Sequence, residues 1–178
     1  MVNEHYMKSA GVIRKVFENE DMVELKQFLS GEALKTVIKA AGSAGLKEDT
    51  TIASHSYSHA QLPGQAVMAD ANKVIRAVTG KSPKSWEVWS FGWKGHLIVN
   101  DSALEKPGID AVLDLTEKWN DEAGGELIYV DGSGGYAATM PEFNKLLIFR
   151  RNKGTHRFVR YVNHLAGKKR RLFLMARL

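Results

Sequence analysis

The sequence predicts a mainly β protein with helices in its N-terminal part, an α+β arrangement whose strands form a sandwich or a barrel. Apolar residues recur at helical spacing before residue 80, and seven short strand-like segments separated by Gly, Pro, Asn and Asp follow it. The 178 residues suit one domain, 1–178. We expect residues 1–80 to form a helical support region and residues 81–178 to form the strand-rich core.

Three helices are expected in the N-terminal part. Met22–Phe28 and Gly31–Ala41 carry apolar side chains at helical spacing, and Ser30 provides a typical start for the second segment. The third helix covers Gly64–Val78, and Gly80 ends it because glycine favours the position after a helix.

The expected strands are short and separated by turn residues. They cover Trp86–Phe91, His96–Val99, Ala111–Leu115, Glu126–Val130, Lys145–Phe149, His156–Val162 and Arg171–Ala176. Asp131–Gly135 is glycine-rich, but it lacks the Gly-Lys-Ser/Thr ending of a phosphate-binding loop. We therefore interpret this segment as a loop joining two strands.

The composition excludes several classes of protein. The sequence has no cysteine, which excludes disulfide scaffolds, thiolate zinc sites, iron–sulfur clusters and cysteine nucleophiles. No apolar run approaches the roughly 18 residues that a membrane span needs. The first residues, Met1–Lys15, lack the apolar centre of a signal peptide. We expect a soluble, cytoplasmic protein with no membrane partner.

Positive charge is concentrated at the C-terminal end. The net charge is +5, and the segment Lys145–Leu178 contains eleven Lys or Arg residues but no Asp or Glu. Such a segment can contact nucleic acid or attract a small anionic ligand, and charge alone does not decide between them. Four tryptophans can stack on bases or pack in the core, and the strand-rich context favours packing for Trp86, Trp89, Trp93 and Trp119.

Histidines and arginines provide the candidate site residues. His55 and His59 have the spacing of zinc ligands on one helix face, but the alternation of Ser54–His59 is typical of an extended segment. His156 begins an expected strand, and Arg171 begins another. An imidazole that ligates a metal and a guanidinium that holds a carboxylate would together bind a chelating organic acid. Each taken alone is more often a packed or solvated residue.

Several motifs in the second half of the chain occur in a characteristic order. They are Val112–Trp119, Gly124–Leu127, Pro141–Asn144, Leu147–Phe149, His156 and Lys169–Leu172. In this order they resemble the Fe(II)/2-oxoglutarate dioxygenases, most closely the prolyl-4-hydroxylase-like branch, from about Trp86 to the C-terminus. The resemblance implies a double-stranded β-helix, a cupin-like jelly-roll barrel. It also implies an oxidoreductase, a hydroxylase of unknown substrate.

The resemblance further implies a site for Fe(II) and 2-oxoglutarate. His156 corresponds to the distal iron histidine, and Arg171 to the arginine that binds the cosubstrate, with Arg170 as the alternative register. The sequence departs from the family at the His-x-Asp motif, where it reads Asp101-Ser-Ala103. Asp101 is then a substitute metal ligand, and iron needs more strong ligands than His156 and Asp101 supply.

Three functions follow from these observations. The first is a dioxygenase that uses Fe(II) and 2-oxoglutarate, a small-molecule cosubstrate, to hydroxylate a peptide or small molecule. The second is a catalytically degenerate relative that acts as a binding module for an anionic partner. The third is direct nucleic-acid binding through Lys145–Arg171.

Overall fold

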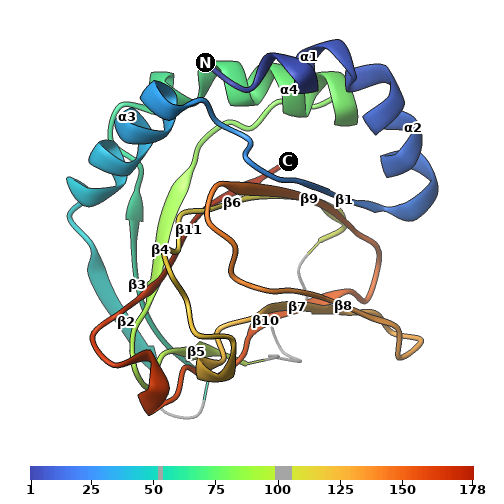
Figure 1. Ribbon diagram of the computed structural model, residues 1–178. Helices are drawn as coiled ribbons and strands as arrows, with labels where there is room; N and C mark the ends of the chain where they lie inside the picture. Colours follow the sequence, from blue (N-terminus) through green and yellow to red (C-terminus); the bar gives the residue numbers. More distant parts are fainter. Residues whose placement is uncertain (52–53, 99–105) are drawn as a thin grey trace.

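A computed structural model describes residues 1–51, 54–98 and 106–178 of the chain (Figure 1). Within these ranges the helices are α1 Glu4–Lys8, α2 Ala10–Glu20, α3 Gly31–Gly42 and α4 Ala69–Thr79, with 3-10 turns η1 Gln65–Met68, η2 Asp121–Ala123 and η3 His164–Ala166. The strands are β1 Met22–Leu25, β2 Lys47–Thr51, β3 His55–Gln61, β4 Glu87–Phe91, β5 His96–Leu97, β6 Gly108–Asp114, β7 Leu127–Val130, β8 Tyr136–Thr139, β9 Lys145–Arg151, β10 His156–Val159 and β11 Arg171–Arg177. No helix in the described ranges is long and apolar enough to cross a bilayer.

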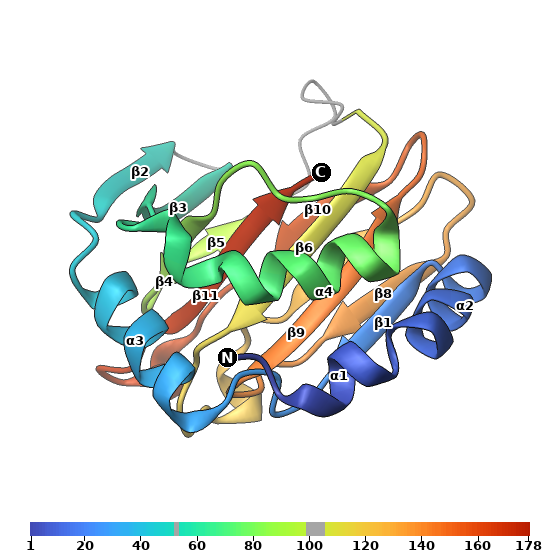
Figure 2. The ribbon, with the colours of Figure 1, turned by 90° about the horizontal axis from the view of Figure 1, so that it is seen from above.

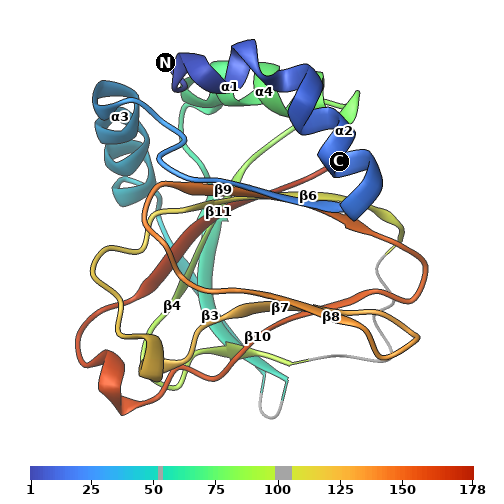
Figure 3. The same cartoon turned by 45° about the vertical axis from the view of Figure 1, so that its right-hand side comes forward.

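The strands form one curled antiparallel sheet in the order β1-β9-β6-β11-β4-β3-β5-β10-β7-β8, with β2 paired to β3. Figures 1 and 3 show two facing layers, with β1, β9, β6 and β11 above and β5, β10, β7 and β8 below. Strands β4 and β3 connect the layers on one side. This curl agrees with the jelly-roll-like architecture that the sequence predicts.

Helices cover the outer face of the upper layer, which Figure 2 shows from above. A first apolar core lies between them and the sheet, where Phe17, Val37 and Ile75 from the helices meet Leu146 and Leu174 from the strands. All five side chains are fully buried. Each contributes about 1.5–3 kcal/mol to folding relative to an exposed side chain, so this core holds the helices on the sheet.

A second core lies inside the curl, between the two layers. Strand alternation separates the two cores: on β11 the side chains of Phe173 and Met175 belong to the inner cluster, and those of Leu174 and Ala176 belong to the helix-facing one. The neighbouring Arg171 shares the inner side with Phe173, because residues two apart on a strand point the same way.

The two ends of the sheet, β1 and β8, are joined through side chains. The Thr139 hydroxyl donates to Glu24 Oε1 at 2.6 Å, and Lys145 Nζ donates to the same oxygen at 3.0 Å. Deeper in the interior, the rings of Tyr129 and Phe149 stack with centroids 3.9 Å apart. In the strand order, β1 and β8 are not paired with each other through their backbones. These side-chain contacts therefore hold the lower layer against the upper one.

The helices expected at Gly31–Ala41 and Gly64–Val78 are confirmed as α3 and as η1 followed by α4. Gly80 ends α4 with a positive φ of 76°. The helix expected at Met22–Phe28 is wrong, because Met22–Leu25 is strand β1 and alternates in burial while pairing with β9. Four residues are too few to separate a helical from a strand pattern.

All seven expected strands occur within the described residues, with small shifts at their ends; that expected at His96–Val99 is seen as His96–Leu97, and Val99 lies outside the described residues. The loop expected at Asp131–Gly135 joins β7 to β8. Strands β2, β3 and β8 and helices α1 and α2 were not expected as such. Residues 1–80 therefore supply three strands of the sheet, β1, β2 and β3, as well as helices.

Candidate functional site

Arg171 lies inside the barrel and is only 1 % exposed. Its guanidinium forms an ion pair with Asp114, donates to Thr116 Oγ1 at 2.8 Å and donates to the Gly125 carbonyl at 3.1 Å. It also lies over the Phe173 ring, 4.9 Å from the centroid. Burial lowers the pKa of the Arg171 guanidinium, and the charge of Asp114 acts in the opposite direction. The guanidinium that the sequence assigned to a ligand carboxylate is thus paired with a carboxylate of the protein.

Strand β10 places His156 and Arg157 on opposite faces. Arg157 and Val159 are buried, and Val159 belongs to the inner core, whereas His156 is half-buried. Arg157 Nη1 donates to Asp110 Oδ2 of the facing layer at 2.6 Å, so the inward position is held by a guanidinium. His156 points the other way because neighbouring side chains on a strand alternate. The structure therefore does not bring His156 to the side of the sheet where Arg171 lies.

Asp110 is the centre of a buried polar cluster. This carboxylate is fully buried, accepts from Arg151 Nε at 2.9 Å and from Arg157, and accepts from the Tyr129 hydroxyl at 3.1 Å. Burial raises the pKa of Tyr129 well above its ordinary value, and the charge of Asp110 adds to that shift. Because charged groups inside a protein need partners, the carboxylate and the guanidinium groups stabilise one another.

The two histidines considered as zinc ligands lie on β3 and share one carboxylate. His55 Nε2 is 2.9 Å from Asp49 Oδ1, and His59 Nε2 is 3.9 Å from Asp49 Oδ2. The other nitrogen of His55, Nδ1, lies 2.9 Å from the Ser54 hydroxyl. The hydrogen bond to His55 lowers the pKa of Asp49. The two histidines therefore lie on one face of an extended strand and contact Asp49 on the neighbouring strand β2. The extended conformation is the one that the alternation of Ser54–His59 predicts.

The basic C-terminal segment is largely neutralised within the protein. Seven of its eleven cations form ion pairs in the described ranges: Lys145 with Glu24, Arg150 with Asp21, Arg151 and Arg157 with Asp110, Arg160 with Glu126, Arg171 with Asp114, and Arg177 with Glu87. The other four are exposed, and three of them are consecutive: Lys153, Lys168, Lys169 and Arg170. This placement does not support nucleic-acid binding along the whole of Lys145–Arg171.

Most of the tryptophans are packed. Trp86 and Trp89 are buried, as the sequence predicts, and the indole nitrogen of the half-buried Trp119 donates to a backbone carbonyl at 2.8 Å. Trp93 is 58 % exposed, with Lys94 Nζ 4.9 Å from its ring centroid. Of the four tryptophans considered for stacking on nucleic-acid bases, only Trp93 is exposed.

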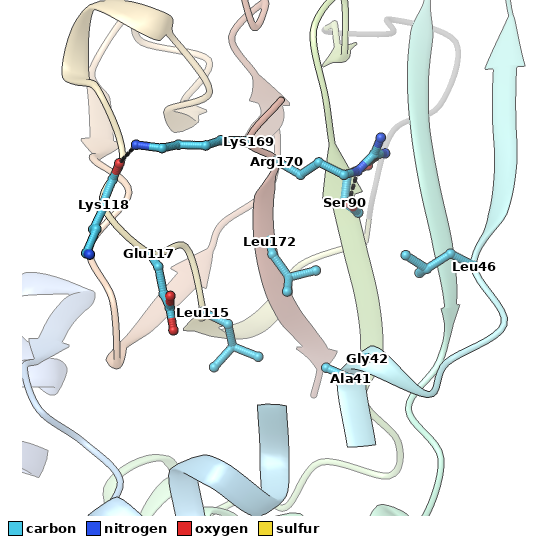
Figure 4. Close-up of a pocket in the computed structure, with 10 residues that line it drawn as sticks. All are labelled: Ala41, Gly42, Leu46, Ser90, Leu115, Glu117, Lys118, Lys169, Arg170 and Leu172. Carbon is cyan, nitrogen blue, oxygen red and sulfur yellow. Dashed lines mark hydrogen bonds between the residues drawn. The ribbon is translucent and has the colours of Figure 1, made fainter. Parts of the chain in front are cut away.

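A cavity of about 450 Å³ lies outside the barrel, between α3 and the start of β11 (Figure 4). Its apolar lining comes from Ala41, Gly42, Leu46, Leu115 and Leu172, and its polar lining from Ser90, Glu117, Lys118, Lys169 and Arg170. Arg170 reaches this rim because it lies on the face of the chain opposite to its neighbour Arg171. We call this space the outer cavity.

Comparison with known proteins shows what the architecture is. No family model matches the sequence, and no curated protein matches it significantly. Solved structures match over nearly the whole chain. A prolyl-4-hydroxylase of Pseudomonas putida superposes with a TM-score of 0.75 and 13 % identity, covering 95 % of this chain and 97 % of that one. The chain has the fold of a prolyl hydroxylase.

Two further structures agree. A prolyl hydroxylase from Trichoplax adhaerens, solved with a hypoxia-inducible-factor peptide, gives a TM-score of 0.78 at 12 % identity, covering 98 % of this chain and 90 % of that one. A 2OG-Fe(II) oxygenase family protein from Burkholderia pseudomallei gives 0.72 at 11 % identity, covering 94 % and 89 %. At these identities the likeness concerns the fold, and function depends on the site residues.

The described residues do not fit the iron and 2-oxoglutarate of these prolyl hydroxylases and oxygenases. Among them there is no group of three or more His, Asp or Glu placed to hold a metal ion. His156 points away from the interior, and Arg171 is already bound to Asp114. Asp101, the expected substitute ligand, lies outside the described residues.

Sequence reasoning missed Arg157 and Asp110, although signals for both exist. Asp110 is a carboxylate within the otherwise apolar run Ile109–Leu113, which indicates a buried charge with a partner. Arg157 and Val159 are two residues apart on one strand, so their side chains lie on the same face. If the apolar Val159 faces the interior, Arg157 faces it too. That reading moves His156 to the outer face.

Proposed function

We propose that this protein is a binding module for an anionic partner, built on the jelly-roll fold of the prolyl hydroxylases and lacking oxygenase turnover. One observation carries the proposal. Of two neighbouring arginines, Arg171 is buried against Asp114, and Arg170 is exposed at the rim of the outer cavity. No acidic partner contacts Arg170 among the described residues.

The buried pair argues against cosubstrate binding in the barrel. A 2-oxoglutarate carboxylate that bound Nη1 of Arg171 would have to displace Asp114 from it. Breaking a buried ion pair by removing one partner costs about 3–5 kcal/mol, because the remaining charge stays in the interior. Arg157, at the inward position of β10, carries a positive charge that would repel a metal ion.

The exposed cations can take an anionic partner without such a loss. Lys168, Lys169 and Arg170 are solvent-accessible and close together in the sequence. Guanidinium and ammonium groups bind carboxylate or phosphate through charge-assisted hydrogen bonds. The partner therefore meets the turn between β10 and β11.

The test measures binding of two labelled anionic probes, poly-glutamate and single-stranded DNA, by fluorescence anisotropy. We expect at least one to bind with an affinity that falls as salt is added. The double variant Lys169→Gln/Arg170→Gln weakens binding about tenfold. The control Lys81→Gln/Lys153→Gln removes the same charge from other exposed positions and leaves binding unchanged. Absence of binding, or equal losses in the two variants, would overturn the proposal.

A second candidate is the hydroxylase itself, which the likeness of fold over 95 % of the chain favours. In that reading His156 and Asp101 hold Fe(II), and Arg171 or Arg170 binds 2-oxoglutarate. Purified protein is incubated with Fe(II), 2-oxoglutarate and ascorbate, and succinate is measured with and without candidate peptide or small-molecule substrates. We expect no succinate above the level of a His156→Ala control. Turnover that depends on His156 would establish the hydroxylase and exclude the binding module as the main function.

A further inference from the structure

The outer cavity has two chemically different parts. Leu115, Leu172 and Ala41 form an aliphatic floor, with Leu46 at one side. Figure 4 shows Lys169 and Arg170 extending in opposite directions from the start of β11, above the leucine side chains. An apolar floor beside cationic groups is the pattern of a site for a ligand with an apolar body and an anionic end.

Arg170 is held in a fixed position by two buried serines. Its Nε donates to Ser90 Oγ at 2.6 Å, and its Nη2 donates to Ser58 Oγ and to the Ser90 carbonyl, each at 3.3 Å. Ser90 and Ser58 are 1 % and 7 % exposed. Neutral partners orient the guanidinium and leave its charge uncompensated, so it is prepared for an anion.

We propose that the outer cavity binds an amphiphilic monocarboxylate, such as a medium-chain fatty acid. This inference rests on the proposed function, and it names the ligand class for the same cations. The alkyl chain lies on Leu115 and Leu172. The carboxylate is bound by Arg170, because Lys169 extends the other way and donates to the Lys118 carbonyl. The volume of about 450 Å³ is within the range of small-molecule sites.

Inside the cavity itself, two features of the lining favour this class over a nucleotide or a polyanion, which would contact the same cations from the surface. The apolar lining of the outer cavity is aliphatic, and among the described residues no aromatic ring lines it on which a base could stack. Glu117 also lines the cavity, and its carboxylate repels a ligand with several negative charges more than one with a single charge. An alkyl chain with one carboxylate satisfies both conditions.

Isothermal titration calorimetry with decanoate tests the proposal, with acetate and decanol as probes that lack the chain or the charge. We expect decanoate to bind and both partial probes to bind at least about tenfold more weakly. Arg170→Gln weakens decanoate binding about tenfold, and Leu46→Gln weakens it several-fold through the apolar side. Glu117→Gln strengthens it, because the repelling charge is removed.

Lys153→Gln is the matched control, since Lys153 is exposed and belongs to the same basic segment but does not line the cavity. Decanoate binding that is unchanged in this variant and weakened in Arg170→Gln supports the proposal. Failure of decanoate, with polyanion binding still dependent on Lys169 and Arg170, rejects the ligand class and leaves the proposed function standing. Failure of all anionic probes rejects both.

Discussion

Arg170 and Arg171 are neighbours on the chain, yet they belong to two regions with different electrostatics. Arg171 lies in the barrel interior, where Asp114 of β6 neutralises it. Arg170 lies at the outer cavity, where serines hold it and its charge faces solvent. Successive side chains on an extended chain point to opposite faces, so only one of the two neighbouring arginines can contact Asp114 in the interior. The same chain segment therefore supplies one arginine to the interior and one to the surface.

Strand β10 repeats the same lesson. The inward residue is Arg157, paired with Asp110, and the outward residue is His156. In both strands the inward guanidinium is matched by an aspartate on β6. The interior is thus stabilised by ion pairs between β6 and the facing guanidinium groups.

The largest expected effect comes from Asp110→Asn. This change leaves Arg151 and Arg157 in the interior without their shared carboxylate, so the free energy of unfolding falls by about 3–5 kcal/mol. Urea denaturation at pH 7 measures it. Asp49→Asn serves as the control, because that carboxylate is much more exposed and its loss costs about 1 kcal/mol or less. Equal losses in the two variants would contradict a stabilising role for the interior pairs.

A smaller effect separates the two neighbouring arginines. Arg171→Met leaves Asp114 buried, although the carboxylate still accepts from the backbone N–H groups of Thr116 and Glu142. We expect a loss of about 2–3 kcal/mol in the free energy of unfolding. Arg170→Met changes it by about 1 kcal/mol or less. If thermal or urea unfolding shows the Arg170 variant to be the less stable one, the assignment of interior and exterior is wrong.

The smallest effect concerns the junction between β1 and β8, and it depends on pH. Burial raises the pKa of Glu24, but hydrogen bonds from Thr139 and Lys145 and the charge of Lys145 bring it below the ordinary value of 4.5. A lowered folded-state pKa gives stability that is present above pH 4.5 and is lost as pH falls through the folded value. Glu24→Gln should lower the free energy of unfolding by about 1 kcal/mol at pH 7 and by less at pH 3, as measured by urea denaturation. If the difference in the free energy of unfolding between Glu24→Gln and the unmodified protein is larger at pH 3 than at pH 7, this mechanism is excluded.

Much of the fold could be predicted from the sequence, because periodicity and caps are local signals. Helix α3 shows helical spacing, and Gly80 marks the end of α4. Strand β1 could not be identified, since it is short and gains its stability from pairing with β9. The start of β11 at Arg171 was predicted correctly.

The candidate site was less predictable, because it depends on strand pairing. The register of β11 against β6, with Phe173 opposite Asp114, brings Asp114 to Arg171 from 57 residues earlier in the chain, and no local pattern announces it. The alternation of β10 determines which side of the sheet His156 faces. That side can be assigned only when Val159 is known to face the interior. The outer cavity lies between α3 and β11, which are far apart in the chain, so no local pattern indicates it.

The way the sheet closes has a consequence for its motions. On one side, β4 and β3 join the two layers through continuous backbone pairing, whereas within the described residues β1 and β8 meet through the side chains of Glu24, Thr139 and Lys145. Side-chain contacts break one at a time, and backbone ladders open cooperatively. Amide hydrogens of β8 should therefore exchange with solvent before those of the central strand β11. The first water to enter by that route would meet Tyr129 and the charges around Asp110.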